Sequence, residues 1–497
     1  MKLSVNPEVL SLLSWISTIL KEHNVKAYLV GGLVRDALLG RDTADIDIAV
    51  DADALKVAPQ VADATGGTFV LLDKENGVAR VVLANEADTR TRRQYHLDIS
   101  TMAGGIEDDL ARRDFTVDAM AVDLGQLVAS PMDAKLIDPF QGQIDLKKKI
   151  IRAVSGKAFE MDAVRLLRAV RLAAELGFSI DEETEIQICH HSPLIGGVAG
   201  ERVREELLRI LALPRSGYFL RELDRLNLLT ALIPELAPAR GVEQPKEHVW
   251  DVFDHSLETV AAVEFLLRTG RWEHAKEDVL KVVPWSEEIA RHFAEEVSSG
   301  STRTSLLKLA ALLHDIAKPQ AKTFDPDGRM RFLGHAEEGA RTAVEVLERL
   351  RFSNKEIKQV ELMVKYHMRA AQMSSNGVPT RRAIYRYFRD TGDAGVDTIF
   401  LGLADHLAAR GPTLVKDQWM GHAREMEYVL MQKFQEELVP PARLVDGHEL
   451  MAVFGIHPGP KLGRILEELR EAQAAGELST KQQALSYIRE HLLYERV

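Results

Sequence analysis

Residues 27–50 of the chain, AYLVGGLVRDALLGRDTADIDIAV, place a glycine pair between apolar runs and end on two spaced aspartates. Residues 27–30 predict a short buried strand that ends at the glycines. Residues 34–39 predict a short helix closed by Gly40, because glycine is common just after a helix end. Residues 45–50 alternate in polarity, which predicts a second strand with one face in the core.

The two aspartates of this stretch predict a metal site. Asp45 and Asp47 are two residues apart on the predicted strand, so both side chains leave the same face. Two carboxylates this close repel each other unless a cation lies between them, and Mg²⁺ prefers such oxygen ligands. Gly31 and Gly32 allow a ligand to approach the backbone, and Arg35 adds a planar cation for phosphate oxygens. We therefore expect a nucleoside triphosphate site; the alternative is a glycine turn beside two solvated aspartates.

The pattern of the sequence changes at about residue 150. Before it, helical apolar spacing at residues 7–22 and further strands at 68–72, 78–83 and 95–100 indicate an α/β arrangement. After it, nearly every segment has an apolar period of about 3.6 residues, which predicts helices. The fold class is therefore α+β multidomain, with a head of mixed sheet and helices followed by all-α domains.

Composition excludes several classes of protein. The 497 residues are 46% hydrophobic and 28% charged, with a formal net charge of -12. This charge argues against a protein that coats nucleic acid nonspecifically, although a local basic groove on an acidic body is compatible with it. The single cysteine, Cys189, rules out an intrachain disulfide and a zinc thiolate cluster and suits a reducing compartment. With no apolar segment of a signal peptide or a membrane span in the sequence, we expect a cytoplasmic protein with no membrane partner.

Residues 28–50 resemble the signature of the class II tRNA nucleotidyltransferase and bacterial poly(A) polymerase family, within the DNA polymerase beta superfamily. Two later stretches also resemble motifs of that family: EDDLARRDFT at residues 107–116 and DAVRLLRAVR at residues 162–171. The matched order and spacing run across about the first 180 residues. The resemblance implies a polymerase-beta-like head and two-metal nucleotidyl transfer from ATP or CTP to an RNA 3′-hydroxyl.

The resemblance also implies roles for individual residues. Asp45 and Asp47 are implied as catalytic metal ligands, and Asp98 is our choice for the third carboxylate usual in that superfamily. Asp162 and Arg165 lie three apart on a predicted helix and could pair with the edge of a base, as this pair does in the resembled family. The alternative is a helix with an ion pair and solvated arginines. The other predicted nucleotide contacts are Gly31, Gly32, Arg35, Arg112, Arg113, Asp114, Arg168 and Arg171.

Two positions depart from the family pattern. Met161 stands where glutamate is usual, with Glu160 beside it, and Asp118 stands where asparagine is commoner. The first bears on base selection, and the second adds a negative charge near the predicted active site. Neither removes a proposed metal ligand, so both concern which nucleotides are added rather than the class of reaction.

A second group of polar residues predicts a metal site downstream. His255, then His314 and Asp315 on an apolar helix, then Asp405 resemble the ligand order of HD-domain phosphohydrolases. His335 and His367 fall where that superfamily often has extra histidines. Imidazole and carboxylate suit a divalent ion (Mg²⁺, Mn²⁺, Ni²⁺ or Fe²⁺) that can generate hydroxide from water. An active site here would hydrolyse phosphate esters at RNA ends; the alternative is a vestigial or structural site.

We predict four domains: a nucleotidyltransferase head (1–152), a helical neck and body that binds the nucleotide base and tRNA (153–240), an HD domain (241–430) and a helical tRNA-binding tail (431–497). The expected function is template-independent addition of all or part of the 3′-terminal CCA to tRNA, from CTP and ATP. The alternatives are a poly(A) polymerase on other RNAs and an HD phosphohydrolase whose degenerate head binds RNA. The sequence leaves the oligomeric state open.

Overall fold

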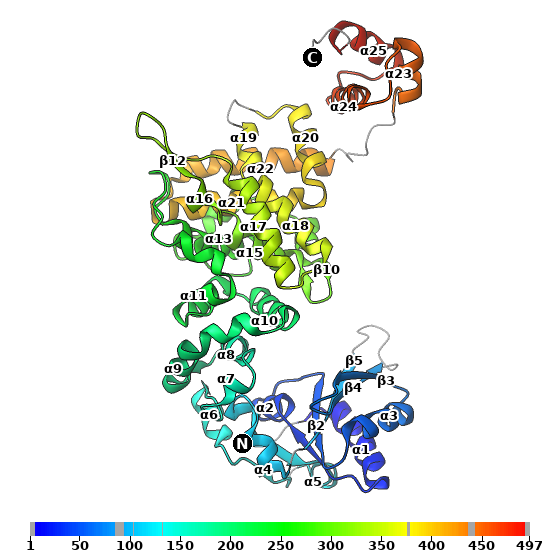
Figure 1. Ribbon diagram of the computed structural model, residues 1–497, viewed down its shortest axis with the longest axis vertical. Helices are drawn as coiled ribbons and strands as arrows, with labels where there is room; N and C mark the ends of the chain where they lie inside the picture. Colours follow the sequence, from blue (N-terminus) through cyan, green and yellow to red (C-terminus); the bar gives the residue numbers. More distant parts are fainter. Residues whose placement is uncertain are drawn as a thin grey trace. The chain divides into compact units, whose positions relative to one another are not determined.

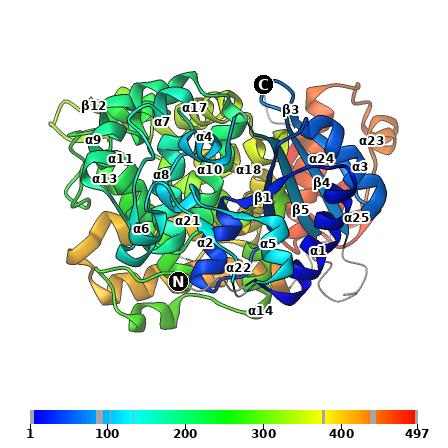
Figure 2. The same ribbon diagram turned by 90° about the horizontal axis from the view of Figure 1, so that it is seen from below.

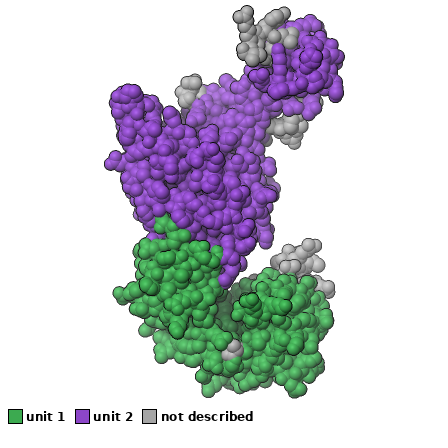
Figure 3. Space-filling model, viewed as in Figure 1, with its two compact units in different colours: residues 1–198, 225–231 green, residues 199–224, 232–497 purple. Residues whose placement is uncertain are grey.

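The computed structural model describes residues 5–84, 94–102, 104–131, 133–374, 378–435 and 443–492 (Figure 1). The chain forms two compact units, one of residues 1–198 and 225–231 and the other of residues 199–224 and 232–497 (Figure 3). Within the described ranges, no helix has both the length and the apolar character that a membrane span requires. The domain boundaries at 152, 240 and 430 stay predictions.

One seven-stranded mixed sheet forms the centre of the head, in the order β3-β4-β5-β2-β1-β6-β7. β2 pairs in parallel with β5 and antiparallel with β1, so the predicted mixed sheet is confirmed. The strands are β1 (Ala27–Val30), β2 (Asp45–Val50), β3 (Thr68–Asp73), β4 (Val78–Ala84), β5 (Gln94–Thr101), β6 (Ala121–Asp123) and β7 (Leu136–Ile137).

The helices of the first unit pack on this sheet and continue beyond it. α3 packs against β4, and α5 packs against β1 and β6 (Figures 1 and 2). The short strands β8 (Ile150–Ile151) and β9 (Ser179–Ile180) pair in parallel beyond the head sheet. The helical segments are α1 (Pro7–Glu22), α2 (Gly32–Leu39), α3 (Ala54–Thr65), α4 (Ile106–Ala111), η1 (Thr116–Asp118), α5 (Leu124–Ala129), α6 (Gly142–Lys148), α7 (Ala158–Met161), α8 (Arg165–Leu176), α9 (Glu182–His191) and η2 (Ser192–Gly197).

Among its described residues, the second unit is helical apart from two hairpins. Its centre is the group α13, α15 and α21, which contact one another and are buried on most sides, and α18 packs against α15 and α21. The segments are α10 (Gly200–Ala212), α11 (Ser216–Arg225), η3 (Pro234–Ala239), α13 (Val252–Leu266), η4 (Glu277–Val282), α14 (Glu287–Ala294), α15 (Arg303–Leu313), α16 (Lys318–Ala321), α17 (His335–Arg349), α18 (Asn354–Tyr366), α19 (Arg369–Ser374), α20 (Arg381–Thr391), η5 (Gly392–Ala394), α21 (Gly395–Arg410), η6 (Gly411–Thr413) and α22 (Lys416–Gln435). The short helix α12 (Leu229–Leu232) belongs to the first unit except for its last residue. The last part holds α23 (Gly447–Phe454), α24 (Pro460–Ala474), α25 (Lys481–Tyr487) and η7 (Ile488–Leu492) around a small core of its own.

The prediction of helix throughout this half was wrong at two short hairpins. β10 (Glu296–Ser298) pairs with β11 (Ser301–Thr302), and β12 (Lys322–Phe324) pairs with β13 (Met330–Phe332). Each hairpin turns at a glycine with positive φ, Gly300 in the first and Gly328 in the second. Such a turn lets a few residues pair locally without any apolar repeat that the sequence would show.

Candidate functional site

Three carboxylates lie on one face of the head sheet. Asp47 on β2 is in register with Asp98 on β5, the strand parallel to it. Asp45, two residues before Asp47, shares that face, and its side chain is 74% exposed while Asp47 is half-buried. Adjacent strands are about 5 Å apart, so the three side chains form one acidic cluster at the sheet surface.

Charged neighbours act on the inner two carboxylates. Arg80 on β4 binds Asp98 through two bonds, from Nε to Oδ1 (2.7 Å) and from Nη2 to Oδ2 (2.8 Å). Burial raises the pKa of Asp47 to about 6, against the attraction of the Arg113 guanidinium. A bound cation would offset the cost of burying the charged Asp47 carboxylate. The cluster therefore suits a metal ion.

Gly31 fits this site because no other residue has room there. Its φ is 70°, and an added Cβ would lie 2.7 Å from Oδ2 of Asp47 and 2.8 Å from Nη1 of Arg113. Gly32 is different, since a Cβ there would meet only the side chain of Arg35 at 3.5 Å. The chain between β1 and α2 therefore lies directly against the carboxylate cluster.

Arg35 is buried and faces inward. Its Nη1 donates to Oδ1 of Asp118 (2.6 Å), and its Nε and Nη2 donate to Asp36 (2.9 and 3.1 Å). The negative charge that Asp118 adds near the site is therefore paired with Arg35. A contact of Arg35 with phosphate stays a prediction, and it would have to compete with these three bonds.

Three of the other predicted nucleotide-binding arginines, Arg113, Arg165 and Arg168, act on the Asp114 carboxylate. Arg168 Nε lies 2.9 Å from Oδ2 of Asp114. Burial would raise the pKa of Asp114, but Arg168 and Arg165 hold it below its usual value. Arg165 donates to the carbonyl oxygens of Ala158 (3.2 Å) and Arg112 (2.8 Å), and the Arg112 side chain is exposed.

One detail of the predicted base-selecting helix was wrong. α7 ends at Met161, Asp162 is extended (φ −157°), and α8 begins only at Arg165, so the pair does not share one helix. The Asp162 carboxylate instead accepts from the Val164 N–H (3.3 Å), a short-range bond of the kind that competes with helix. Arg171 is buried and pairs with Glu175 (2.6 Å), and its contact with a nucleotide stays a prediction.

The predicted HD ligands come together in the second unit. His255 lies on α13 and Asp405 on α21, and His255 Nε2 is 3.0 Å from Asp405 Oδ1. His314 Nε2 is 3.1 Å from Asp315 Oδ2, and His255 Nε2 is 3.5 Å from the same oxygen. The prediction that His314 and Asp315 lie within a helix was wrong, because α15 ends at Leu313 and both residues follow it.

Two further histidines contact the other oxygen of Asp315. Oδ1 lies 3.4 Å from Nε2 of His335 and 3.8 Å from Nε2 of His367. The Nδ1 atoms of His314, His335 and His367 each lie within 2.8 Å of a backbone carbonyl three residues earlier. This contact fixes the ring so that the Nε2 lone pair faces the cluster, as in metal-binding histidines.

Several buried atoms of the cluster make no hydrogen bond of normal geometry with the described residues, although charged neighbours lie 2.6–3.5 Å from some of them. They are both ring nitrogens of His255, Nε2 of His314 and of His335, and both oxygens of Asp315. A buried polar atom without a hydrogen bond costs about 1–3 kcal/mol, and a cation bound among these atoms would offset that cost. Burial lowers the pKa of His367 to about 4, which keeps this ring neutral and able to bind a cation. The donor set fits a divalent metal.

Sequence reasoning missed three residues at these sites. Arg80 binds Asp98 only because of the strand register, which the sequence does not show. His248 joins His255 and Asp405 from the loop before α13, and no spacing rule identifies it. Lys318 Nζ lies 2.6 Å from Oδ2 of Asp315, and its place three residues after Asp315 is a signal that could have found it.

Comparison with known proteins agrees with this arrangement. Family models match residues 27–152 (“Poly A polymerase head domain”), 177–240 (“Probable RNA and SrmB-binding site of polymerase A”), 252–410 (“HD domain”) and 433–488 (“tRNA nucleotidyltransferase domain 2 putative”). Among solved structures, a CCA-adding enzyme in its apo form I has a TM-score of 0.63 at 21% identity, over 99% of this chain and 96% of that one. The Thermotoga maritima CCA-adding enzyme complexed with tRNA has a TM-score of 0.59 at 22% identity, over 98% and 96%. At these identities the likeness shows the fold.

Two curated relatives match along nearly the whole length. The A-adding tRNA nucleotidyltransferase of Deinococcus radiodurans is 34% identical, over 93% of this chain and 94% of the relative. The CC-adding tRNA nucleotidyltransferase of Thermus thermophilus is 33% identical, over 93% of each. The chain therefore belongs to the tRNA nucleotidyltransferase family, and it is an enzyme of the nucleotidyltransferase type.

Proposed function

We propose that the head adds part of the 3′-terminal CCA to tRNA, using CTP or ATP. The observation that carries this proposal is the cluster of Asp45, Asp47 and Asp98 against the glycine turn at Gly31. Three carboxylates on one sheet face are the oxygen donors that two Mg²⁺ ions need. The relatives named above are tRNA nucleotidyltransferases, which supports tRNA as the proposed substrate.

The residues of the site have separate roles in this reaction. Asp45, Asp47 and Asp98 would hold the metals, whose chemistry is to activate the 3′-oxygen and offset charge on the pyrophosphate. The turn at Gly31 leaves room for a triphosphate close to the backbone. Arg113 and Arg168 supply positive charge beside Asp47, and Asp162 with Arg165 would present acceptors and donors to the base.

Partial addition is favoured over complete CCA by the pattern of relatives. The A-adding and CC-adding relatives match over 93% of this chain, whereas the CCA-adding enzyme of Geobacillus stearothermophilus matches over 44%. The A-adding and CC-adding relatives are also nearly equal in identity, so the product has to be measured. A cytoplasmic location remains part of the proposal, since tRNA maturation is the activity proposed.

The test is a product-length assay. Purified full-length protein is incubated with tRNA ending before the CCA, after its first C, after both C residues, or complete, with Mg²⁺, CTP and ATP. We expect either two C additions or one A addition, and no product from Asp47→Ala. Complete CCA addition would overturn the partial assignment, and long A tracts would favour the poly(A) polymerase alternative. Incorporation by Asp47→Ala would overturn the metal assignment.

We propose in addition that the HD cluster hydrolyses phosphate esters at RNA ends. Its support is the buried donor set around Asp315, where two groups of ligands share one carboxylate. A cavity of about 950 Å³ adjoins the cluster and is lined by His248, His335 and several cations, among them Lys318, Arg329 and Arg331. Those cations suit a phosphorylated substrate. A divalent ion held there would supply hydroxide from bound water.

The HD proposal is tested apart from the head. Phosphatase and cyclic phosphodiesterase activities are measured with Mg²⁺, Mn²⁺, Ni²⁺ and Fe²⁺, and the metal content of the purified protein is determined. Asp315→Ala should abolish hydrolysis and metal retention while nucleotide addition continues. Asp47→Ala should abolish nucleotide addition while hydrolysis and metal retention at the HD cluster continue. Absence of hydrolysis with all four ions would overturn the proposed activity.

A further inference from the structure

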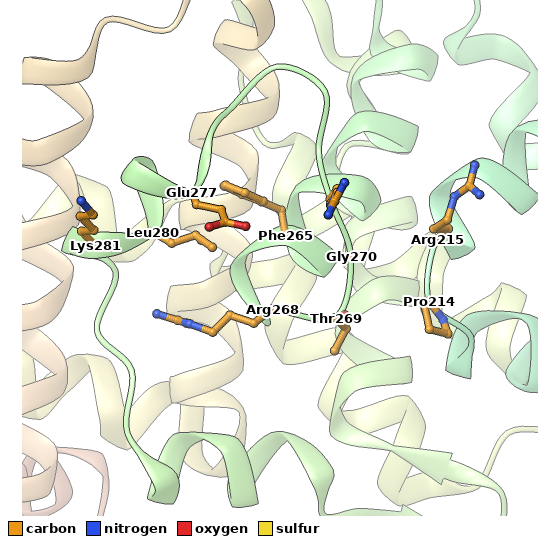
Figure 4. A pocket seen from close by; sticks show the side chains of 10 residues that line it. Pro214, Arg215, Phe265, Arg268, Thr269, Gly270, Glu277, Leu280 and Lys281 are labelled. Carbon is orange, nitrogen blue, oxygen red and sulfur yellow. The ribbon is translucent and has the colours of Figure 1, made fainter.

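The second unit has another cavity, of about 890 Å³ (Figure 4). It shares no lining residue with the cavity beside the HD cluster. Its walls come from the turn before α11, the C-terminal end of α13 with the loop after it, and η4. Neither the head chemistry nor the HD chemistry uses any of these residues.

The lining is strongly basic within an acidic chain. It holds four cations, Arg215, Arg268, Arg271 and Lys281, and one carboxylate, Glu277. None of the four forms a salt bridge with any residue that the structure describes. Cations left without carboxylates in a protein of net charge -12 concentrate positive potential at one place, which favours an anionic ligand.

Arg268 is held in position for such a ligand. Its guanidinium carbon lies 4.3 Å from the centre of the Trp285 ring, and its Nη1 donates to the carbonyl of Leu266 (3.3 Å). Arg268 is largely exposed, and the partial burial of its guanidinium lowers its pKa with no carboxylate acting against this shift. A stacked, planar guanidinium with its other N–H groups still available is suited to phosphate oxygens.

The backbone at two of these arginines is unusual. Arg215 has a φ of 64° and Arg268 a φ of 60°, in the left-handed region that most residues avoid. Such conformations persist where the surrounding structure requires them, and they are concentrated at ligand-binding sites. The positions of the Arg215 and Arg268 side chains therefore depend on two turns with strained backbone.

The cations are spread along the cavity. In Figure 4, Arg215 and Lys281 lie at opposite ends and Arg268 lies between them. A row of cations matches successive phosphates of a nucleic acid strand better than it matches one small anion. Arg268 covers one face of the Trp285 ring, so that face is not available to stack on a base.

We propose that this cavity binds the phosphate backbone of the RNA substrate and contributes affinity without reading base sequence. The identity of this RNA as tRNA rests on the proposed function. The proposal predicts a salt-dependent share of tRNA binding that can be removed without touching either catalytic cluster.

The test is tRNA binding by full-length protein, followed by fluorescence anisotropy between about 50 and 200 mM salt. Arg215→Gln with Arg268→Gln should weaken binding about ten-fold at the lowest salt and reduce the slope of log K against log salt by about 1–2. At saturating tRNA, kcat and the KM for the nucleotide should not change. Glu277→Gln should tighten binding, because it removes the one negative charge of the cavity. Arg341→Gln, on α17 and paired with Glu338, should match the wild type.

An unchanged salt slope in the double variant would overturn the proposal, provided its melting temperature matches the wild type. Weaker binding of free ATP or CTP with unchanged tRNA binding would overturn it in favour of a nucleotide pocket. A failure of the proposed function would look different: the wild type would add no nucleotide, while salt-dependent RNA binding through the cavity could still be measured.

Discussion

Arg80 and Asp98 form a two-bond ion pair across β4 and β5, with N–O distances of 2.7 and 2.8 Å, beside the half-buried Asp47. The pair is directly opposite in register, so the guanidinium fixes the orientation of the carboxylate proposed as the third metal ligand. Arg80 therefore acts on the site through Asp98.

The first prediction follows from this pair. Arg80→Ala should lower nucleotide addition by about 10- to 100-fold, the usual effect of losing a residue that orients a metal ligand. The Mg²⁺ concentration for half-maximal activity should rise, and Arg80→Lys should restore part of the loss. A steady-state Mg²⁺ titration checks this. Wild-type activity and Mg²⁺ dependence in Arg80→Ala would contradict the positioning role.

The second prediction concerns the glycine turn. Gly31→Ala should abolish nucleotide addition, because its Cβ would overlap Asp47 and Arg113. Gly40→Ala is the matched control, since Gly40 also has a positive φ, of 69°, but nothing lies within 4 Å of an added Cβ. The control should lose about 1 kcal/mol of stability and keep its activity. Equal activity losses in the two variants would show that backbone strain, and not the close approach, is responsible.

The third prediction concerns a buried ion pair in the second unit. Lys308 Nζ donates to Glu264 (2.9 Å) and to the carbonyls of Leu211 and Leu213, and Glu264 also accepts from Ser216. Lys308→Met should lower the free energy of unfolding by about 3–5 kcal/mol, because it leaves the Glu264 charge buried and unpaired. Adding Glu264→Gln should recover part of this loss. Urea unfolding of both variants provides the measurement, and a loss well under 1 kcal/mol in the single variant would contradict it.

The fourth prediction is a pH dependence. Burial lowers the pKa of His406 to about 3, and this ring stacks on His422. A histidine with a lowered folded pKa contributes stability above its unfolded pKa of about 6.5, and the contribution is lost as the pH falls toward the folded value. His406→Phe should therefore reduce the loss of stability between pH 7 and pH 5 by about 1–2 kcal/mol. Melting curves at several pH values test this, and parallel curves for the two proteins would contradict it.

Local pattern was enough to predict much of the fold. The strands at 27–30 and 45–50, the helix at 7–22 and the cap at Gly40 follow from apolar spacing and glycine chemistry, and the structure confirms them. The break at Asp162 and the hairpin at Gly300 were not predicted, because short polar segments carry no periodic signal.

By itself the sequence determined the residue types of both sites, since carboxylates two apart on a strand must share a face. Only the tertiary structure decided which partners those residues meet. Arg80 lies on Asp98 through strand register, Arg35 is turned inward by Asp118, and His335 and His367 reach Asp315 through helix packing. These relationships join residues far apart in the chain, and their energies depend on burial and distance, which local spacing does not encode.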